Sequence, residues 1–430
     1  MTGLDPRRGW SLGRWVVLGL GLGCQREAPG GARRRPHVEP PVVVEPAADA
    51  GTGRCVRRVS APEDIALGPT IGAPRLAWNG AHFGIVWTET IDEEDVVRFV
   101  RADAEGTRLA LPLRVSERRF LAANPSVTWN GDSWSVVFAG GVRVMGDIYQ
   151  ARIDARGSGV GRPWRMTRGP QHDAEPEFFA TGQGFGLAWT SLEPSGRWSM
   201  YAEALNRWDA PLAPPTQLFN TSFRLLSPRL LWTGSAWAVA FLSARQEVSG
   251  VHLARMEASG LRRGGVNRVT PDRIAGTETA HRFDIAWDGR SFGLVWSELR
   301  DGTPQLFFRR LTPRGNPDGP VLSLRVADEQ SENPSLAHLG DGVFALAEQV
   351  VRDGFPRVRV RTLHADGRIQ TEGVELRGLD GAAARPALLY NGTVLGLATR
   401  SQRGLAFHIV HLGPCPATAS ALAPVRPPGE

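Results

Sequence analysis

One short pattern recurs along the chain at a nearly constant spacing, and this repetition limits the possible folds more than any other feature. Its first copy reads PRLAWNGAHFGIVWTE, from Pro74 to Glu89. Six further copies begin at Pro125, Pro176, Pro228, Phe283, Pro334 and Pro386. The glycines in the middle of the copies are Gly80, Gly131, Gly182, Gly234, Gly289, Gly340 and Gly392, in steps of 51, 51, 52, 55, 51 and 52 residues. Such a period predicts a propeller, a solenoid or an array of small domains.

Each repeat contains the pattern of four short strands. The first strand alternates, as in Pro74 to Trp78, and an Asn-Gly or Asp-Gly pair then favours a hairpin in which both residues take positive φ. The second strand, as in Phe83 to Trp87, is apolar on both faces, which is typical of a strand buried between neighbours. One position in it is small in most copies: Gly84, Ser135, Gly186, Ala238, Gly293 and Gly396. A third, more polar strand and a fourth, outer strand complete the unit.

Seven units of four strands predict an all-β, seven-bladed β-propeller over residues 54–415. A solenoid would need distinct capping repeats, and a unit of this size has too little core to fold alone. The seventh repeat lacks its outer strand, whereas Cys55 to Ser60 resembles the outer strand Leu113 to Ser116 of the first repeat. We therefore expect the N-terminal strand to complete the last blade and close the ring.

The ends of the chain differ in composition from the repeats. Residues 1–24 contain arginines, a short apolar run and then Gly23-Cys24, which predicts an export signal. The ending resembles a bacterial lipoprotein signal, which implies lipidation of Cys24; an ordinary secretory signal is the alternative. Residues 25–53 are rich in Pro and Ala and predict a disordered tether, and residues 416–430 predict a disordered tail.

The repeats resemble the W-N-G…F-x-V-V-W units of bacterial secreted and surface propeller proteins. They are also distantly similar to propeller repeats of the TolB type, in which a proline, an aromatic residue and a D-G turn recur. This resemblance covers about residues 54 to 415 and implies the fold. It implies little about function, because propellers carry many unrelated activities.

The charge and the chemistry-bearing residues narrow the function without naming it. All 50 basic residues are arginine and the net charge is +6, but the arginines are scattered, so nucleic acid is not expected as a partner. No catalytic motif, cofactor loop or metal-ligand spacing is present. The acidic run Asp92 to Asp95 could hold a hard cation, but it lacks the alternating spacing of a calcium loop and favours a solvated loop.

The regular phase of the aromatic residues at Trp87, Phe138, Trp189, Phe241 and Trp296 indicates core packing rather than a carbohydrate platform. The pattern breaks in the last two repeats, where gap-free spacing places Ala347 and Thr399 at this position. Candidate ligand-binding residues are therefore sought in the loops expected at the channel mouth: Glu89, Asn124, Glu175, Ser191, Glu298, Asn333, Glu348 and Arg400.

We expect a monomeric, non-catalytic binding module, anchored in a bacterial envelope, whose partner is a protein, a peptide or a glycan. A propeller-type glycosidase or lyase and a scaffold subunit are the alternatives. Export also predicts a disulfide between Cys55 and Cys415. Cys55 begins the strand that closes the ring, and Cys415 follows the strand that it would pair with, so the two residues should be neighbours in space.

Overall fold

The computed structural model of the protein describes residues 42–43, 54–68, 70–141, 146–245, 249–271, 283–326, 329–352, 354–376, 384–401 and 404–415. The expected signal at residues 1–24, including Cys24, lies outside the described residues. So do the expected tail and, except for Val42–Val43, the expected tether. No helix in the described part of the chain is long and apolar enough to cross a lipid bilayer.

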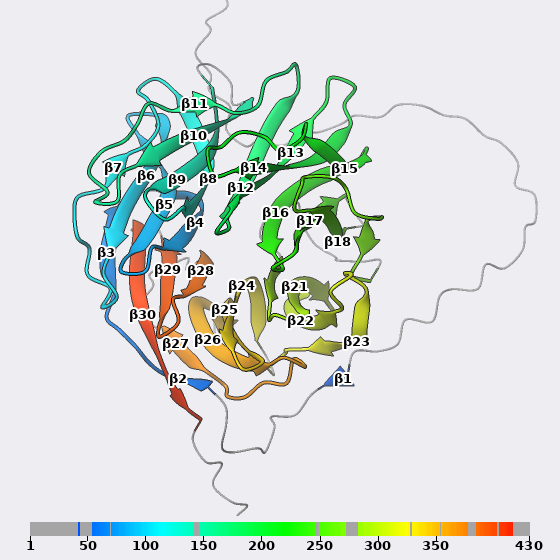
Figure 1. The fold of residues 1–430 in the computed structure, drawn as a ribbon. Coiled ribbons are helices and arrows are strands. Elements are labelled where there is room, and N and C mark those ends of the chain that lie inside the picture. The colour runs from blue at the N-terminus through cyan, green and yellow to red at the C-terminus, as the bar shows by residue number, and fades with distance from the viewer. Residues whose placement is uncertain are drawn as a thin grey trace, which may run out of the picture. The chain divides into compact units, whose positions relative to one another are not determined.

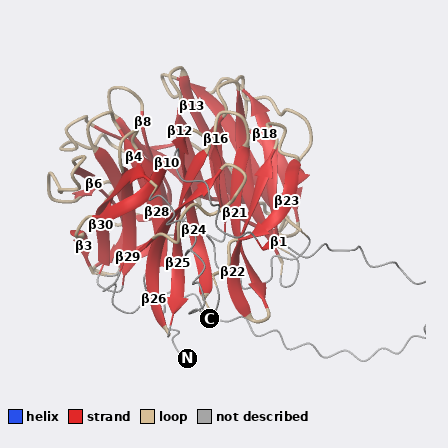
Figure 2. Ribbon diagram, turned by 90° about the horizontal axis from the view of Figure 1, so that it is seen from below, coloured by secondary structure: helices blue, strands red, loops and turns tan. Residues whose placement is uncertain are grey.

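Seven antiparallel sheets follow one another along the chain and surround a central axis as the blades of a propeller (Figures 1 and 2). The innermost strands of blades one to seven are β4 (Thr70–Trp78), β8 (Leu121–Trp129), β12 (His172–Ala180), β16 (Arg224–Trp232), β20 (Phe283–Trp287), β24 (Gln330–Gly340) and β28 (Ala384–Tyr390). The second strands are β5 (Phe83–Ile91), β9 (Trp134–Gly141), β13 (Gly184–Leu192), β17 (Ala236–Ala244), β21 (Phe292–Arg300), β25 (Val343–Arg352) and β29 (Leu395–Ser401).

The outer half of each blade is more polar. The third strands are β6 (Glu94–Ala102), β10 (Asp147–Ile153), β14 (Trp198–Asn206), β18 (Gly250–Glu257), β22 (Thr303–Leu311), β26 (Phe355–His364) and β30 (Gly404–Pro414). The outermost strands are β7 (Leu113–Arg114), β11 (Trp164–Arg165), β15 (Thr216–Thr221), β19 (Asn267–Arg268), β23 (Pro317–Ser323), β27 (Val374–Leu376) and β2 (Arg54–Val59). In addition, β1 (Val42–Val43) pairs with β23, and β3 (Glu63–Leu67) pairs with β30.

Contact between blades explains the small residue inside each second strand. A Cβ atom added to Gly84 would lie 2.5 Å from the Trp134 ring of the next blade, and one added to Gly186 would lie 2.8 Å from Trp237. The same contact joins the last blade to the first, because a Cβ atom on Gly396 would lie 2.7 Å from the Phe83 ring. The ring is therefore closed by the same packing that joins its other blades.

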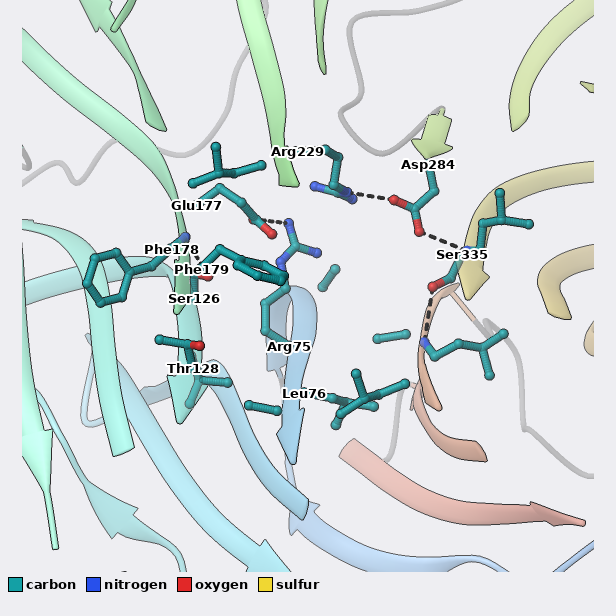
Figure 3. Close-up of a pocket in the computed structure, with 18 of the residues that line it drawn as sticks. Arg75, Leu76, Ser126, Thr128, Glu177, Phe178, Phe179, Arg229, Asp284 and Ser335 are labelled. Carbon is teal, nitrogen blue, oxygen red and sulfur yellow. Dashed lines mark hydrogen bonds and ion pairs between the residues drawn. The ribbon is translucent and has the colours of Figure 1, made fainter. Parts of the chain in front are cut away.

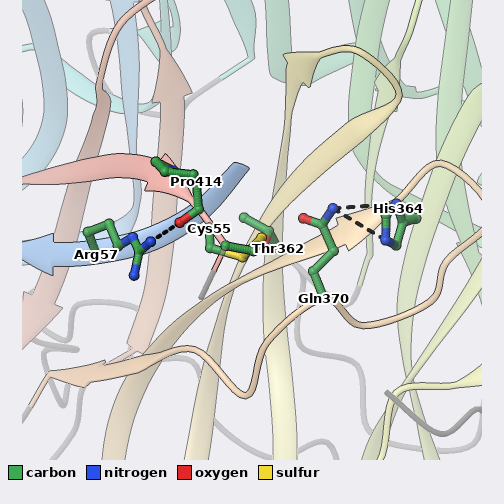
Figure 4. Close-up of a disulfide and its surroundings, with 7 residues drawn as sticks. Cys55, Arg57, Thr362, His364, Gln370 and Pro414 are labelled. Atoms are coloured by element: carbon green, nitrogen blue, oxygen red, sulfur yellow. Dashed lines mark hydrogen bonds between the residues drawn. A yellow bond between two sulfur atoms is a disulfide. The ribbon is translucent and has the colours of Figure 1, made fainter. Parts of the chain in front are cut away.

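The closing seam is formed as the sequence predicts. Strand β2 pairs antiparallel with β30 of the seventh blade, and Cys55 is bonded to Cys415, with their Cα atoms 4.9 Å apart (Figure 4). Arg54 donates hydrogen bonds to the Leu339 carbonyl oxygen and to the Tyr390 hydroxyl, at 2.6 Å each. Because structural disulfides persist in oxidising compartments, this bond supports a location outside the reducing cytoplasm.

The hairpins between first and second strands differ from the expected form. Gly80, Gly131, Gly289 and Gly392 take positive φ, but the Asn or Asp before each of them does not. Instead, the Asn79 side chain accepts hydrogen bonds from the backbone N–H groups of Ala81 and His82, at 2.9 and 2.7 Å. The residue before glycine therefore closes the turn through its side-chain oxygen.

One register prediction is wrong by a residue. In the sixth blade, His338 pairs with Phe344, as Trp78 pairs with Phe83 in the first blade, so the hairpin holds one extra residue. Glu348, and not Ala347, therefore occupies the position of Trp87. Thr399 does occupy it in the seventh blade, where it pairs with Ala406 in the same register as Trp87 pairs with Arg98.

Candidate functional site

The innermost strands place one side chain from each blade around the central channel. These residues follow the repeated proline, or Phe283 in the fifth repeat. From blade one to blade seven they are Arg75, Ser126, Glu177, Arg229, Asp284, Ser335 and Ala387, and we call them the channel ring. Figure 3 shows six of them converging on the same space. A pattern in the sequence indicates this ring, since a polar residue follows the repeated position in six of seven copies. The ring was not among the predicted sites.

The charged members of the channel ring form two ion pairs. Arg75 lies 3.3 Å from a carboxylate oxygen of Glu177, and Arg229 lies 2.9 Å from one of Asp284 (Figure 3). Burial lowers the pKa of Arg229, but the carboxylates of Asp284 and Glu177 outweigh it, so the pKa is raised overall. The ring is thus balanced in charge, with both signs facing one channel.

The oxygen-bearing members of the ring also join neighbouring blades. An innermost strand has one unpaired edge, and its free N–H groups need acceptors. Ser126 accepts a hydrogen bond from the Phe178 N–H at 3.1 Å, and Ser335 accepts one from the Leu388 N–H at 3.0 Å. Asp284 accepts one from Leu336 at 2.8 Å while it pairs with Arg229. These bonds fix the ring before any ligand arrives.

A cavity of about 440 Å³ lies within the channel and is lined by all seven innermost strands. Its wall combines the ring with apolar side chains such as Leu76, Phe179 and Leu389. Cavities that bind small ligands combine a mainly apolar wall with a few polar groups in this way, and their volumes begin at roughly 300 Å³.

A second cavity of about 140 Å³ adjoins the first, and Arg75 and Glu177 line both. Its wall includes residues that precede the repeated prolines and take positive φ: Asn124 (53°), Glu175 (49°), Ser227 (52°) and Arg385 (61°). Non-glycine residues rarely adopt this conformation. Each one lies at a shift in strand pairing just before a ring residue.

Three of the eight candidate residues lie at the channel. Asn124 and Glu175 line the smaller cavity, and Asn333 lines the larger one. Burial raises the pKa of Glu175, and a hydrogen bond from the Ser227 N–H partly offsets this effect. Asn333 donates a hydrogen bond to the Gln349 side chain at 3.2 Å.

The other five candidates line neither cavity. Glu89 accepts a hydrogen bond from the Trp87 indole at 3.0 Å, and Glu298 accepts one from Trp296 at 3.4 Å. Ser191 and Glu348 are fully buried, and Arg400 donates a hydrogen bond to the Gly72 carbonyl oxygen at 3.3 Å. All eight candidates lie inside strands and not in loops, because the strands extend further than their sequence pattern indicated.

The acidic run of the first blade forms part of a tight hairpin. Asp92 and Glu93 take positive φ, Glu94 pairs with Arg114 at 2.9 Å, and Asp95 accepts a hydrogen bond from Thr90 at 2.9 Å. Within the described ranges, no group of three or more His, Cys, Asp or Glu side chains is arranged to hold a metal ion.

Comparisons with known proteins give structural likeness alone. No family model and no curated protein matches the chain. Similar solved structures include a subtype N10 neuraminidase-like protein of a little yellow-shouldered bat isolate, with 12% identity, 84% of this chain and 100% of that chain covered, and a TM-score of 0.44. Another is the β-propeller domain of the Trilobed protease from Pyrococcus furiosus, with 10% identity, coverage of 80% and 96%, and a TM-score of 0.46. A third is TolB from Acinetobacter baumannii, with 13% identity, coverage of 75% and 78%, and a TM-score of 0.37. At these scores the likenesses carry no argument about the chemistry of this chain.

Proposed function

We propose that this propeller is a non-catalytic binding module whose central channel receives a polar group of a protein, peptide or glycan partner. The observation that carries the proposal is the channel ring, in which Arg75, Glu177, Arg229 and Asp284 form two fixed ion pairs beside a cavity of about 440 Å³. Side chains held in place before binding lose little conformational entropy when a ligand arrives, which favours affinity.

The state of the ring carboxylates favours binding over catalysis. Asp284 accepts hydrogen bonds from Arg229 and from the Leu336 N–H, and Glu177 is paired with Arg75. Most glycosidases need one carboxylic acid that protonates the leaving oxygen and a second carboxylate that activates a water molecule or attacks the sugar. Here both carboxylates are already engaged by arginines, Glu177 by Arg75 and Asp284 by Arg229. The enzyme and scaffold readings remain alternatives that the binding experiment can separate.

The chemistry of the ring suggests the kind of ligand group. Guanidinium, carboxylate and hydroxyl groups lie close together, and apolar side chains form the remaining wall. A ligand with hydrogen-bond donors and acceptors on a compact frame fits this combination. A peptide terminus or a terminal sugar has these properties, and either would enter the channel while the rest of the partner stays outside.

We also propose that a lipid on Cys24 anchors the module to a bacterial membrane. The apolar run followed by Gly23-Cys24 supports this proposal, as does the disulfide between Cys55 and Cys415. Fatty-acid labelling of cells that express the whole chain provides a test. Wild type should be labelled and recovered with membranes, whereas Cys24→Ala should be unlabelled and released. An unlabelled wild-type protein would contradict the anchor and leave the binding proposal untouched.

The channel is tested with defined libraries of peptides and glycans. Wild type is compared with a double variant, Arg229→Gln with Asp284→Asn, which removes one ring ion pair with little change in shape. We expect a ligand class that binds wild type saturably and binds the variant at least about tenfold more weakly, because charged hydrogen bonds are lost. The matched control, Arg162→Gln with Glu117→Gln, removes an exposed pair away from the channel and should bind normally. Equal binding by both variants would place the site elsewhere, and cleavage of a library glycan would favour the enzyme reading.

A further inference from the structure

A third cavity, outside the channel, lies between the fourth and fifth blades. It shares no residue with the two channel cavities. It has a volume of about 490 Å³. Four chain connections contribute to it: the hairpins that contain Thr233 and Gly289, and the turns that follow the third strands β18 and β22. Four arginines line it, Arg255, Arg263, Arg290 and Arg314, together with Trp237 and Trp287. We call this site the arginine pocket.

The arginines of the pocket are not neutralised by any acid among the residues that the structure describes. In the described ranges, no carboxylate forms an ion pair with any of the four. Burial lowers the pKa of Arg255, and the positive charges of Arg263 and Arg314 lower it further. Asp288 lies in the same hairpin as Arg290, but its carboxylate is used within the turn. It accepts hydrogen bonds from the N–H groups of Arg290 and Ser291 and from the Ser291 hydroxyl. Positive charges are thus gathered in one cavity, and the described part of the chain supplies no counter-charge there.

Other blades have an arginine at the position of Arg255, and there an acid lies beside it. The residue of the third strand that pairs with the small residue of the second strand is an arginine in blades one, two, four and five: Arg101, Arg152, Arg255 and Arg310. Arg310 forms an ion pair with Asp318 of its own blade. Arg152 forms an ion pair with Asp209, in the turn of the next blade. Arg101 likewise interacts with Asp154 in the turn of the next blade. In the fourth blade the turn of the next blade supplies Arg314 instead of an acid. Arg255 is therefore the copy without an acidic partner among the described residues.

The backbone that carries the pocket arginines is held in place. The Asn267 side chain donates hydrogen bonds to the Arg314 carbonyl oxygen at 3.1 Å and to the Asn316 side chain at 3.0 Å. The Arg263 N–H donates to the Arg255 carbonyl oxygen at 2.9 Å. The mutual repulsion of these arginines is therefore maintained by the fold and is relieved when an anion binds.

We propose that the arginine pocket binds a phosphate monoester carried by a sugar. Several guanidinium groups around one cavity match the charge and the oxygen arrangement of a phosphate group. The Trp287 ring, which is only partly buried, offers an apolar surface on which the carbon face of a sugar can pack. The ligand arises from either of two sources, a soluble sugar phosphate or the phosphorylated head group of a glycolipid, and the test separates them.

The test uses isothermal titration of the complete mature protein at constant ionic strength with glucose 6-phosphate, inorganic phosphate and glucose. We expect saturable binding of the sugar phosphate, weaker binding of inorganic phosphate, and none of glucose. Arg314→Asp replaces a pocket arginine by an acid in the turn beside Arg255 and should abolish binding, while Arg255→Gln should weaken it at least about tenfold. Arg156→Gln, on an exposed turn without an ion pair, is the matched control and should bind normally.

Two further readouts complete the test. Arg314 is exposed, so circular dichroism should show that Arg314→Asp is folded even if the half-buried Arg255 tolerates no change. Competition between glucose 6-phosphate and vesicles that contain a phosphorylated glycolipid identifies the source by the tighter ligand. Binding that is unchanged in folded Arg314→Asp, or equal binding of glucose, would overturn the proposal.

Discussion

Glu348 offers a direct test of how this fold tolerates a buried charge at a position where the first five blades have an aromatic ring. The side chain is fully buried between Arg359 and Arg361, which are 3% and 0% exposed. It accepts hydrogen bonds from Arg359 Nε at 3.0 Å and Arg361 Nη2 at 3.2 Å, and its Oε1 atom lies 2.7 Å from Arg361 Nε. Glu329 neutralises Arg359 from the other side, so the four buried charges sum to zero.

Glu348→Gln leaves this cluster with one uncompensated positive charge and no access to water. Breaking a buried ion pair by removing one partner costs about 3–5 kcal/mol of the free energy of unfolding. Glutamine keeps one oxygen acceptor, so we expect a loss near the lower end, about 3 kcal/mol. Arg361 bears most of the loss, because among the residues that the structure describes its one other hydrogen-bond partner is the Leu324 carbonyl oxygen, at 2.8 Å.

Urea unfolding at neutral pH, followed by tryptophan fluorescence, measures the loss. The double variant Glu348→Gln with Arg361→Met removes the unpaired charge and should recover most of the stability, which a double-mutant cycle will show as strong coupling. A loss below about 1 kcal/mol in the single variant, or a double variant less stable than the single one, would refute the reasoning.

Three further predictions concern the seam, the blade contacts and a buried acid. Replacing Cys55 and Cys415 by serine should lower the free energy of unfolding by up to about 5 kcal/mol, because the bond closes a loop of 360 residues. Non-reducing urea unfolding measures this, and an unchanged midpoint would argue against the seam as a source of stability. Gly84→Ala places a Cβ atom 2.5 Å from the Trp134 ring and should cost about 1–3 kcal/mol in thermal unfolding, whereas Gly265→Ala, with open space around it, should be neutral. Burial raises the pKa of Glu203 from 4.5 to about 7, so its contribution to stability is complete below pH 4.5 and is lost as pH rises through about 7. Glu203→Gln should therefore raise stability at pH 8 by about 3 kcal/mol and flatten the pH profile between 4.5 and 8; a parallel profile would contradict this origin.

The ring of blades could be predicted from the sequence because the features that build it are local and repeated. The glycine of each hairpin and the small residue of each second strand recur in nearly every copy. The seam required one further step, the recognition that Cys55 begins a strand missing from the last repeat. Antiparallel pairing then predicted that Cys415 lies close to Cys55, and the structure confirms the bond between them, with Gly413 directly opposite Cys55.

Single-residue shifts could not be predicted from spacing alone. One extra residue in the hairpin of the sixth blade moves Glu348 into the Trp87 register, and only strand pairing reveals it. The positive φ values at Asn124 and Glu175 were equally hidden, because nothing in their side chains requires that conformation. The candidate residues at the ends of second strands were assigned to loops because strand pairing continues beyond the apolar pattern. Glu89, for example, still pairs with Thr70 and Val96.

The two arginines of the channel ring, Arg75 and Arg229, do not make the contact between blades that other ring residues make. In the fold, a side chain of the channel ring can accept a hydrogen bond from a free N–H group of the next innermost strand. Ser126, Asp284 and Ser335 supply this acceptor. Arginine has five donors and no acceptor, so Arg75 and Arg229 cannot do so. Their ion pairs keep them in the channel at the expense of that bond, and the fold alone gives no reason for their presence. Selection for a ligand in the channel would explain why they lie there.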